Sequence, residues 1–175
     1  MRYITGIIAL GTFCERDTRG LWNIRRSDYL DEENMRLRES NESPFKDYGI
    51  ERNKIISYHE FTTYNVADHV RAYVDLLYDG KFDFLKGVFA DAINDSRARK
   101  DIFMLVYGKL RHLAVFKEIN EFMEDEFGSA WISYKQAVQA SAEHIANHHE
   151  EMLKLDVLQS KLGTNGKIID ECLEI

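Results

Sequence analysis

Proline and cysteine are scarce in this chain, and long apolar runs are missing. One proline in 175 residues favours helices over a turn-rich β-sandwich, because proline interrupts helices and is common in turns. The two cysteines, Cys14 and Cys172, stand at opposite ends of the chain and fit neither a disulfide framework nor a CxxC zinc site. No stretch reaches the roughly 18 apolar residues of a membrane-spanning helix. These absences predict a cytoplasmic protein with free thiols and no membrane contact.

The N-terminal residues 3–13 form an apolar-leaning run behind Arg2, as in a signal peptide. The run contains Gly6 and Gly11, has one basic residue in front and lacks a small-residue cleavage site. We therefore expect a buried first strand, which includes Ile7 and Ile8, rather than a secretion signal.

The net charge of −7 lies in the last third of the chain. Residues 117–175 carry 5 basic and 12 acidic residues, whereas bases and acids balance in residues 1–116. Direct nucleic-acid binding is therefore not expected. The densest acidic run is 118–126, in which Glu121, Glu124 and Glu126 are candidate contacts for a basic protein partner. The alternative is an ordinary solvent-exposed helix face.

The fold class predicted is mainly α: a helical bundle with a small N-terminal β or irregular lobe and a long C-terminal helix. The lobe spans residues 1–63, with a second strand expected at 50–58 and a short helix near 31–38. The bundle spans residues 64–128, and its first helix is expected to begin at an Asn65 cap. Ser96 is expected to cap the third helix. Apolar residues at helical spacing mark the four bundle helices: Val66, Val70, Tyr73, Val74, Leu77 and Tyr78; Phe82, Leu85, Phe89, Ala92 and Ile93; Ile102, Leu105, Val106, Leu110 and Leu113; Ile119, Phe122, Met123 and Phe127.

Residues 129–175 are predicted to form the long helix and an acidic tail. No glycine or proline interrupts residues 129–162, and the helix is expected to break at Gly163 and Gly166. Its apolar residues recur every seven positions, as in a coiled-coil seam. The candidate partner-binding residues of this seam are Trp131, Val138, Ile145 and Met152. The companion row contains Tyr134, Ser141, His148, Leu155 and Leu162. The seam predicts a protein partner or self-association.

Three patterns offer candidate chemistry. Arg52 and His59 resemble the Arg–His pair of HEPN ribonucleases, in which both residues act from one helix face; the β-branched pair at 55–56 argues against a helix there. His144 and His148 are spaced like metal ligands, but zinc needs three or four ligands, so an exposed helix face is the expected alternative. Cys14 has no histidine at a recognisable spacing. We expect no cofactor, since no glycine-rich phosphate loop is present.

Three groups of positions within residues 1–134 form recognisable motifs: Arg2, Tyr3, Thr5, Gly6, Ala9, Leu10, Cys14, Thr18, Gly20 and Trp22; Ser43, Phe45, Asp47, Tyr48, Gly49, Ile50 and Glu51; His69, Arg71 and Ala72. These motifs resemble those of a family of small uncharacterised bacterial proteins of mobile or defence loci. The chain departs from the family at Leu21 and Asn23, where the family has Asp and His beside the tryptophan. The resemblance implies an accessory protein, an antitoxin-like partner of nucleotidyltransferase-type toxins.

Three functional hypotheses follow from these observations. The first is a non-enzymatic, antitoxin-like protein-binding module that covers a basic partner enzyme. The second is a HEPN-like ribonuclease that uses Arg52 and His59. The third is a structural protein that self-assembles through the long helix. Within the loop 14–22, Trp22 is expected to pin the loop to the bundle, with partner binding as the alternative.

Overall fold

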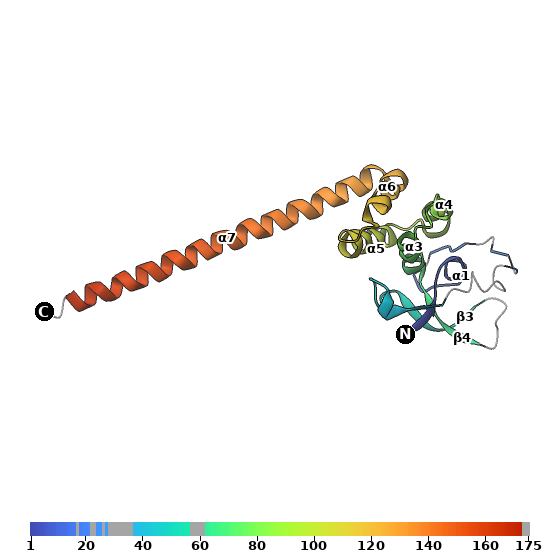
Figure 1. The fold of residues 1–175 in the computed structure, drawn as a ribbon, viewed down its shortest axis with the longest axis horizontal. Helices are drawn as coiled ribbons and strands as arrows, with labels where there is room; N and C mark the ends of the chain where they lie inside the picture. Colours follow the sequence, from blue (N-terminus) through green and yellow to red (C-terminus); the bar gives the residue numbers. More distant parts are fainter. Residues whose placement is uncertain (17, 22–23, 26, 28–36, 57–61, 173–175) are drawn as a thin grey trace. The chain divides into compact units, whose positions relative to one another are not determined.

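A computed structural model describes residues 1–16, 18–21, 24–25, 27, 37–56 and 62–172. The fold is mainly α, with an N-terminal four-stranded sheet and a long C-terminal helix, as the sequence predicts (Figure 1). The chain divides into two compact units, Met1–Trp131 and Ile132–Ile175. The first unit holds both the expected lobe and the expected bundle. The strand at residues 63–67 spans the border expected between them.

The sheet is mixed and has the strand order β2-β1-β4-β3. Its strands are β1 (Arg2–Ile4), β2 (Leu37–Glu39), β3 (Ile50–Ile55) and β4 (Thr63–Ala67). β1 pairs antiparallel with β2 and parallel with β4, and β3 pairs antiparallel with β4. The β3–β4 register shifts between Glu51 and Lys54, where Asn53 adopts a φ of 56°. This bulge bends the outer strand of the sheet.

The first strand is shorter than expected. β1 ends at Ile4, and Ile7–Leu10 form a short helix, α1, so the expectation of a strand through Ile7 and Ile8 is wrong. Gly6 has a φ of 76°, a left-handed conformation that glycine adopts without steric cost. The turn at Gly6 redirects the chain, and Ile8, Ala9 and Leu10 enter the core from a helix instead.

The helical elements after the sheet, in chain order, are α3 (His69–Tyr78), α4 (Phe82–Leu85), η2 (Phe89–Ile93), α5 (Ser96–Leu105), η3 (Val106–Leu110), α6 (Phe116–Phe127) and α7 (Ser129–Cys172). The short elements η2 and η3 are π-helical turns. α3 contacts α1, β4, α4 and α5, so it is the central helix of the first unit (Figure 1).

Both expected N-caps are replaced by aspartates. Asn65 lies inside β4 and its side-chain amide donates to the carbonyl of Arg2, so it begins no helix. Instead, Asp68 caps α3 by accepting a hydrogen bond of 2.7 Å from the backbone N–H of Arg71. Asp95, one residue before Ser96, caps α5 in the same way. A carboxylate satisfies free N–H groups at a helix start as a hydroxyl or amide does and adds a favourable charge.

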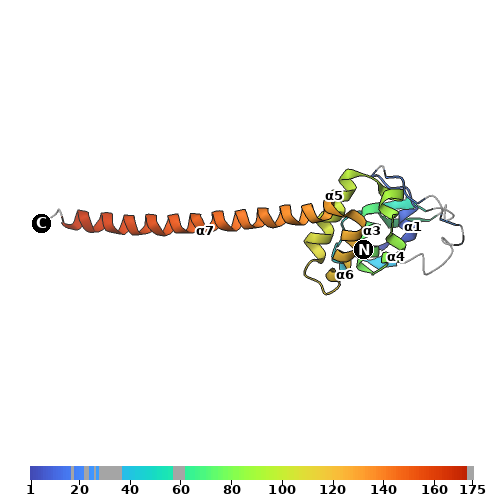
Figure 2. The same ribbon diagram turned by 90° about the horizontal axis from the view of Figure 1, so that it is seen from above.

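α7 is one continuous helix of 44 residues, about 66 Å long at 1.5 Å per residue (Figure 2). The expected break at Gly163 and Gly166 is wrong, because the helix continues through both glycines to Cys172. Each interior glycine costs about 1 kcal/mol relative to alanine in an exposed helix, so these two positions weaken the helix without ending it. Among the described residues, no helix is long and apolar enough to cross a membrane.

Candidate functional site

A fully buried ion pair lies at the centre of the first unit. Arg71 and Asp75 are one turn apart on α3, and Arg71 Nε donates to Asp75 Oδ1 over 3.1 Å. The other carboxylate oxygen accepts hydrogen bonds from the Tyr3 hydroxyl at 2.8 Å and the Thr5 hydroxyl at 2.7 Å. Burial, followed by the negative charge of Asp75, raises the pKa of Tyr3 well above its ordinary value. Tyr3 therefore stays a neutral donor.

Arg71 uses its remaining donors to fix a loop onto α3. Nη1 donates to the carbonyls of Lys46 and Tyr48, each at 2.7 Å, and Nη2 donates to the Tyr3 hydroxyl at 2.5 Å. The guanidinium carbon lies 4.8 Å from the ring centre of Tyr3 and 5.4 Å from that of Phe45. With this full set of contacts and no exposed surface, Arg71 holds the fold together and is not free to bind a ligand.

Arg38 brings a second guanidinium from β2 to the same carboxylates. Its Nη1 lies 3.1 Å from Asp75 Oδ1, and its Nη2 donates to Asp79 Oδ1. Burial alone would lower the pKa of Arg38, but the charges of Asp75 and Asp79 outweigh it and raise that pKa. The edge strand is thereby tied to α3 by charge as well as by the sheet.

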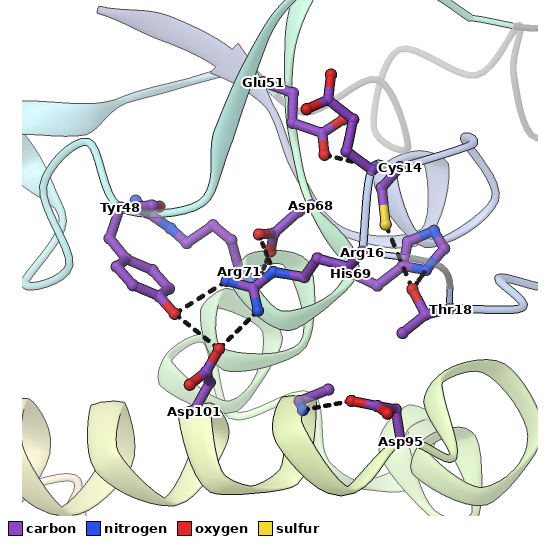
Figure 3. A network of polar contacts seen from close by, with 12 residues as sticks. Cys14, Arg16, Thr18, Tyr48, Glu51, Asp68, His69, Arg71, Asp95 and Asp101 are labelled. Carbon is purple, nitrogen blue, oxygen red and sulfur yellow. Dashed lines mark hydrogen bonds and ion pairs between the residues drawn. The ribbon is translucent and has the colours of Figure 1, made fainter.

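Arg16 forms the outer half of the network (Figure 3), with a side chain that is 26% exposed. It donates to Asp68, to Asp101 at 2.6 Å and to the Tyr48 hydroxyl at 2.9 Å. Tyr48 in turn donates to Asp101 over 3.1 Å. Burial raises the pKa of Asp68, although hydrogen bonds from the Arg71 N–H and from Arg16 act in the opposite direction. Arg16 thus links the N-terminal loop to α3 and α5.

Cys14, Thr18 and His69 form a second cluster beside Arg16 (Figure 3). Cys14 Sγ lies 3.3 Å from Thr18 Oγ1, which is hydrogen-bonded to His69 Nδ1. His69 Nε2 lies 2.9 Å from the carbonyl oxygen of Thr12. Because a carbonyl can only accept, Nε2 carries a proton. A Cβ on Gly20 would lie 2.9 Å from the Leu10 carbonyl, so this loop position requires glycine.

The thiol and the imidazole shift each other toward their charged forms. Burial alone would raise the pKa of Cys14, but hydrogen bonds to His69 and Thr18 outweigh it and lower that pKa. Burial alone would lower the pKa of His69, but its hydrogen bond to Cys14 and the charge of Cys14 raise it. A cysteine–histidine pair of this kind can act as a nucleophile. Here Cys14 is 2% exposed and His69 is 1% exposed, so both side chains are part of the core and out of reach of a substrate.

This pair could not be predicted from local spacing, because Cys14 and His69 are 55 positions apart. The signal that could have found it is the set of residues from which the sequence predicts a family resemblance. Many of them meet in this network: Tyr3, Thr5, Cys14, Thr18, Phe45, Tyr48, His69 and Arg71. In the structure these residues build the first unit around α3.

The HEPN-type pair is not supported at Arg52. Arg52 is exposed on β3, within the segment Ile50–Ile55, so it lies on a strand rather than on the helix face that such a site requires. His59 lies outside the described residues, as do Trp22 and Asn23 of the tryptophan loop.

The alternative metal pair, His144 and His148, is exposed on α7. In the part of the chain that the structure describes, no three His, Cys, Asp or Glu side chains gather as a metal site.

The candidate acidic contacts on α6 differ in their surroundings. Glu121 is exposed. Glu124 accepts a hydrogen bond of 2.8 Å from the Asn120 side chain, and both oxygens of Glu126 lie 3.2 Å from the backbone nitrogen of Gly87. Glu126 therefore stabilises the turn after α4, and Glu121 is the most accessible of the three.

The candidate seam residues of α7 differ in their burial. Trp131 is fully buried in the first unit, against Phe103 and Tyr107, so its assignment as a partner contact is wrong. The ring fills the core because α7 begins inside the first unit, two residues before it. Val138 is half-buried, whereas Ile145 and Met152 are 68% and 46% exposed. The accessible part of the seam therefore begins after Trp131.

Comparison with protein-family models, with curated proteins and with solved structures finds no match for this chain.

Arg16→Gln tests the outer network and its dependence on pH. The change leaves Asp68 and Asp101 without their shared counter-charge, and we expect the free energy of unfolding to fall by about 2–4 kcal/mol near neutral pH. The pKa of Asp68, already raised, rises further in the variant, so the folded variant takes up a proton more readily than the unfolded chain. Its stability deficit should therefore shrink as the pH falls toward about 5. Urea unfolding at both pH values measures this.

Arg99→Gln, at an exposed position of α5, is the matched control and should leave stability unchanged at both pH values. A deficit for Arg16→Gln that grows in acid would contradict the assignment of Asp68 as the partner of Arg16.

Proposed function

We propose that this chain is a non-enzymatic protein-binding module, an antitoxin-like component that covers a basic surface of a partner enzyme. The observation that carries the proposal is the row of exposed apolar side chains on α7. Its exposed members at the heptad core positions are Ile145, Met152 and Leu155, whereas Ile132 and Leu153 are exposed on another side of the helix. Such apolar surface on a helix is typical of a docking element for another protein.

Among the described side chains of the second unit, none forms a core that would cover these residues. None of the described side chains from 132 to 155 is buried. Helices in proteins owe most of their stability to packing of an apolar face rather than to intrinsic propensity. A helix of this length therefore gains stability when another protein covers that face.

An acidic face on α6 supports a partner with a basic surface. Glu118, Glu121 and Asp125 are all exposed and follow one another at intervals of four residues or fewer, which places them on one side of the helix. A surface patch that carries only negative charge speeds association with a basic surface. The antitoxin-like role itself rests on the family resemblance of residues 1–134.

The non-enzymatic part of the proposal agrees with the surroundings of the candidate catalytic groups. The cysteine–histidine pair is buried. All three side-chain nitrogens of Arg71 donate hydrogen bonds to other groups of the first unit. Arg52 is exposed but lies on a strand.

The test is association with the product of the neighbouring gene. A triple variant, Glu118→Gln, Glu121→Gln and Asp125→Asn, removes three charges at nearly constant size. We expect the association rate to fall roughly tenfold at low salt and to lose most of its salt dependence, with a smaller effect on dissociation. Stopped-flow or surface-binding kinetics at two salt concentrations give both rates.

A second triple variant, Glu42→Gln, Asp47→Asn and Asp91→Asn, removes the same charge from other exposed positions of the first unit. Its association rate should remain closer to that of the unmodified chain. Equal effects of the two variants would show that net charge, rather than the α6 face, governs association.

A further inference from the structure

A run of basic side chains follows α5 and η3, although the chain as a whole is acidic. Residues 96–112 contain five basic residues and one acidic residue, and that acid, Asp101, is bound by Arg16. We propose that the exposed face of α5 and η3 binds the phosphate backbone of double-stranded DNA without reading its sequence. This basic face consists of Arg97, Lys100, Lys109 and Arg111, with Met104 and Gly108 among them.

Helical spacing places these residues on one side of α5 and η3. Successive members from Arg97 to Gly108 are three or four residues apart, which is the spacing of one helix face. Lys109 and Arg111 stand one and three positions after Gly108, so they project to either side of it. All six residues are exposed. The basic face is about 20 Å long at 1.5 Å per residue, a length that matches about six phosphates of one DNA strand.

The four cations of the basic face form no ion pair with any described residue. Arg111 stacks on Tyr107, with its guanidinium carbon 5.2 Å from the ring centre, and its Nε lies 2.9 Å from Nε2 of His112. Neither contact neutralises its charge. Since none of the four cations offsets a described carboxylate, all of them are available to an anionic ligand.

Gly108 is a second and independent indication that a ligand approaches this face closely. It lies inside η3, and glycine within a helix is less favourable than alanine. Its φ is not left-handed, and a Cβ at this position would meet no atom within 4 Å. Neither the backbone conformation nor the packing of the described residues therefore requires glycine here. The absence of a side chain does let the backbone of a ligand come close.

The composition of the basic face favours a nucleic acid over an acidic protein. Interfaces between proteins have an apolar and often aromatic centre, whereas protein–DNA interfaces are more polar and much more positively charged. Met104, at 47% exposed, is the one large apolar side chain of the basic face. A surface made mostly of arginine and lysine matches phosphate groups, which both side chains bind well.

The same composition favours a DNA duplex over other nucleic acids. Proteins that hold single strands stack the unpaired bases on aromatic side chains, and the basic face has none. A duplex keeps its bases stacked inside and presents only phosphates to such a face. The major groove of B-form DNA, about 12 Å wide, admits an α-helix, whereas that of an RNA duplex is deep and narrow.

The negative net charge of the chain limits the affinity without preventing binding. Exposed charges more than about 10 Å apart are largely screened at 0.1 M salt, so a phosphate group responds mainly to the face it contacts. Net charge alone predicts no binding of nucleic acid, but the distribution of charge in the structure predicts weak binding that depends strongly on salt. Sequence-independent contacts of this kind give dissociation constants of roughly 1–100 μM near physiological salt.

Fluorescence anisotropy of a labelled duplex of about 20 base pairs measures binding to the full chain. Four neutralised phosphates predict that the dissociation constant rises roughly a hundred-fold between about 50 and 200 mM salt. In the variant Arg97→Gln, Lys100→Gln and Lys109→Gln, we expect binding at about 50 mM salt to weaken at least tenfold, and the rise with salt to shrink to about three- to four-fold. A chain that leaves the duplex unbound at the lower salt concentration would overturn the proposal.

A matched variant, Arg2→Gln, Arg19→Gln and Lys81→Gln, removes the same charge from other exposed positions of the first unit. It should bind the duplex nearly as the unmodified chain does and keep its salt dependence. Equal losses in the two variants would contradict a binding face on α5 and η3.

Gly108→Ala separates the needs of the fold from those of the ligand. Alanine favours the helix and meets no neighbour, so the midpoint of urea unfolding should rise. The added methyl group holds the DNA backbone away, and we expect the dissociation constant for the duplex to rise roughly three-fold or more. A more stable variant that binds DNA as before would contradict a contact at η3.

Competition experiments identify the class of ligand. The labelled duplex is displaced by unlabelled duplex DNA, single-stranded DNA, duplex RNA or polyglutamate at equal total charge. Duplex DNA should compete best. Better competition by single-stranded DNA or by RNA would overturn the assignment to a DNA duplex, and better competition by polyglutamate would assign the basic face to an acidic protein.

The inference and the proposed function concern different surfaces and can fail separately. The α6 variant Glu118→Gln, Glu121→Gln and Asp125→Asn is expected to slow association with the protein partner and should not weaken DNA binding, because it removes only negative charge. Loss of DNA binding in that variant would contradict the assignment to the basic face. A chain that binds no DNA but keeps its protein partner would overturn the inference alone.

Discussion

Asp75→Asn is expected to lower the free energy of unfolding by about 3–5 kcal/mol, because it removes one charge from a buried and fully bonded ion pair. The carboxylate of Asp75 is completely buried and accepts hydrogen bonds from Tyr3, Thr5 and Arg71, with Arg38 Nη1 3.1 Å away. An amide of the same size keeps the volume but offers donors where only an acceptor fits, and it leaves two guanidinium groups without their shared counter-charge. Chemical denaturation followed by circular dichroism measures the loss.

The control is another aspartate paired with a cation on its own helix turn. Asp83 pairs with Lys86 over 2.9 Å, but its side chain is 97% exposed, so solvent already screens the pair. Asp83→Asn should leave the unfolding curve unchanged. A stable Asp75→Asn variant would show that Arg71 and Arg38 find enough compensation from the Lys46 and Tyr48 carbonyls and from Asp79 alone.

Much of the helical part could be predicted from periodicity, since the apolar residues of α3, α5 and α6 recur at helical spacing and are buried in the structure. The residues at which the helices begin depend on capping side chains, which the apolar periodicity does not reveal. Asn65 and Ser96 are good capping residues by type, but each has an aspartate nearby that does the capping. At Asn65, the pairing of β4 with β1 and β3 outweighs the local preference for a helix start.

The polar network could not be predicted from the sequence, because its members are brought together only by the sheet and α3. Tyr3 and Asp75 are 72 positions apart, and Arg16 and Asp101 are 85 apart. Charged residues inside an amphipathic helix are ordinarily placed on its exposed face, whereas Arg71 and Asp75 lie on α3 with no exposed surface. Both charged side chains can be buried because each is paired and hydrogen-bonded in the folded chain.

Trp131→Ala is expected to destabilise the first unit by about 3–5 kcal/mol, because it opens a large cavity in an aromatic core. The Trp131 ring is fully buried, with its centre 5.1 Å from that of Phe103 and 6.0 Å from that of Tyr107. Its indole N–H donates to the side-chain oxygen of Asn120 over 3.0 Å. Trp131→Phe retains most of the ring contacts but loses this donor, so its cost should be smaller. Thermal and urea unfolding rank the two variants.

Trp131→Ala also tests the division of the heptad row. Trp131 lies in the core of the first unit, whereas the residues of the same row from Ile145 onward are exposed. The two ends of the row should therefore respond in opposite ways. Trp131→Ala should lower the stability of the first unit without changing how the folded chain binds its partner, whereas Ile145→Asp should weaken partner binding without lowering that stability. Trp131→Ala protein that is fully stable but no longer associates would place the tryptophan back in the seam, as its spacing alone predicts.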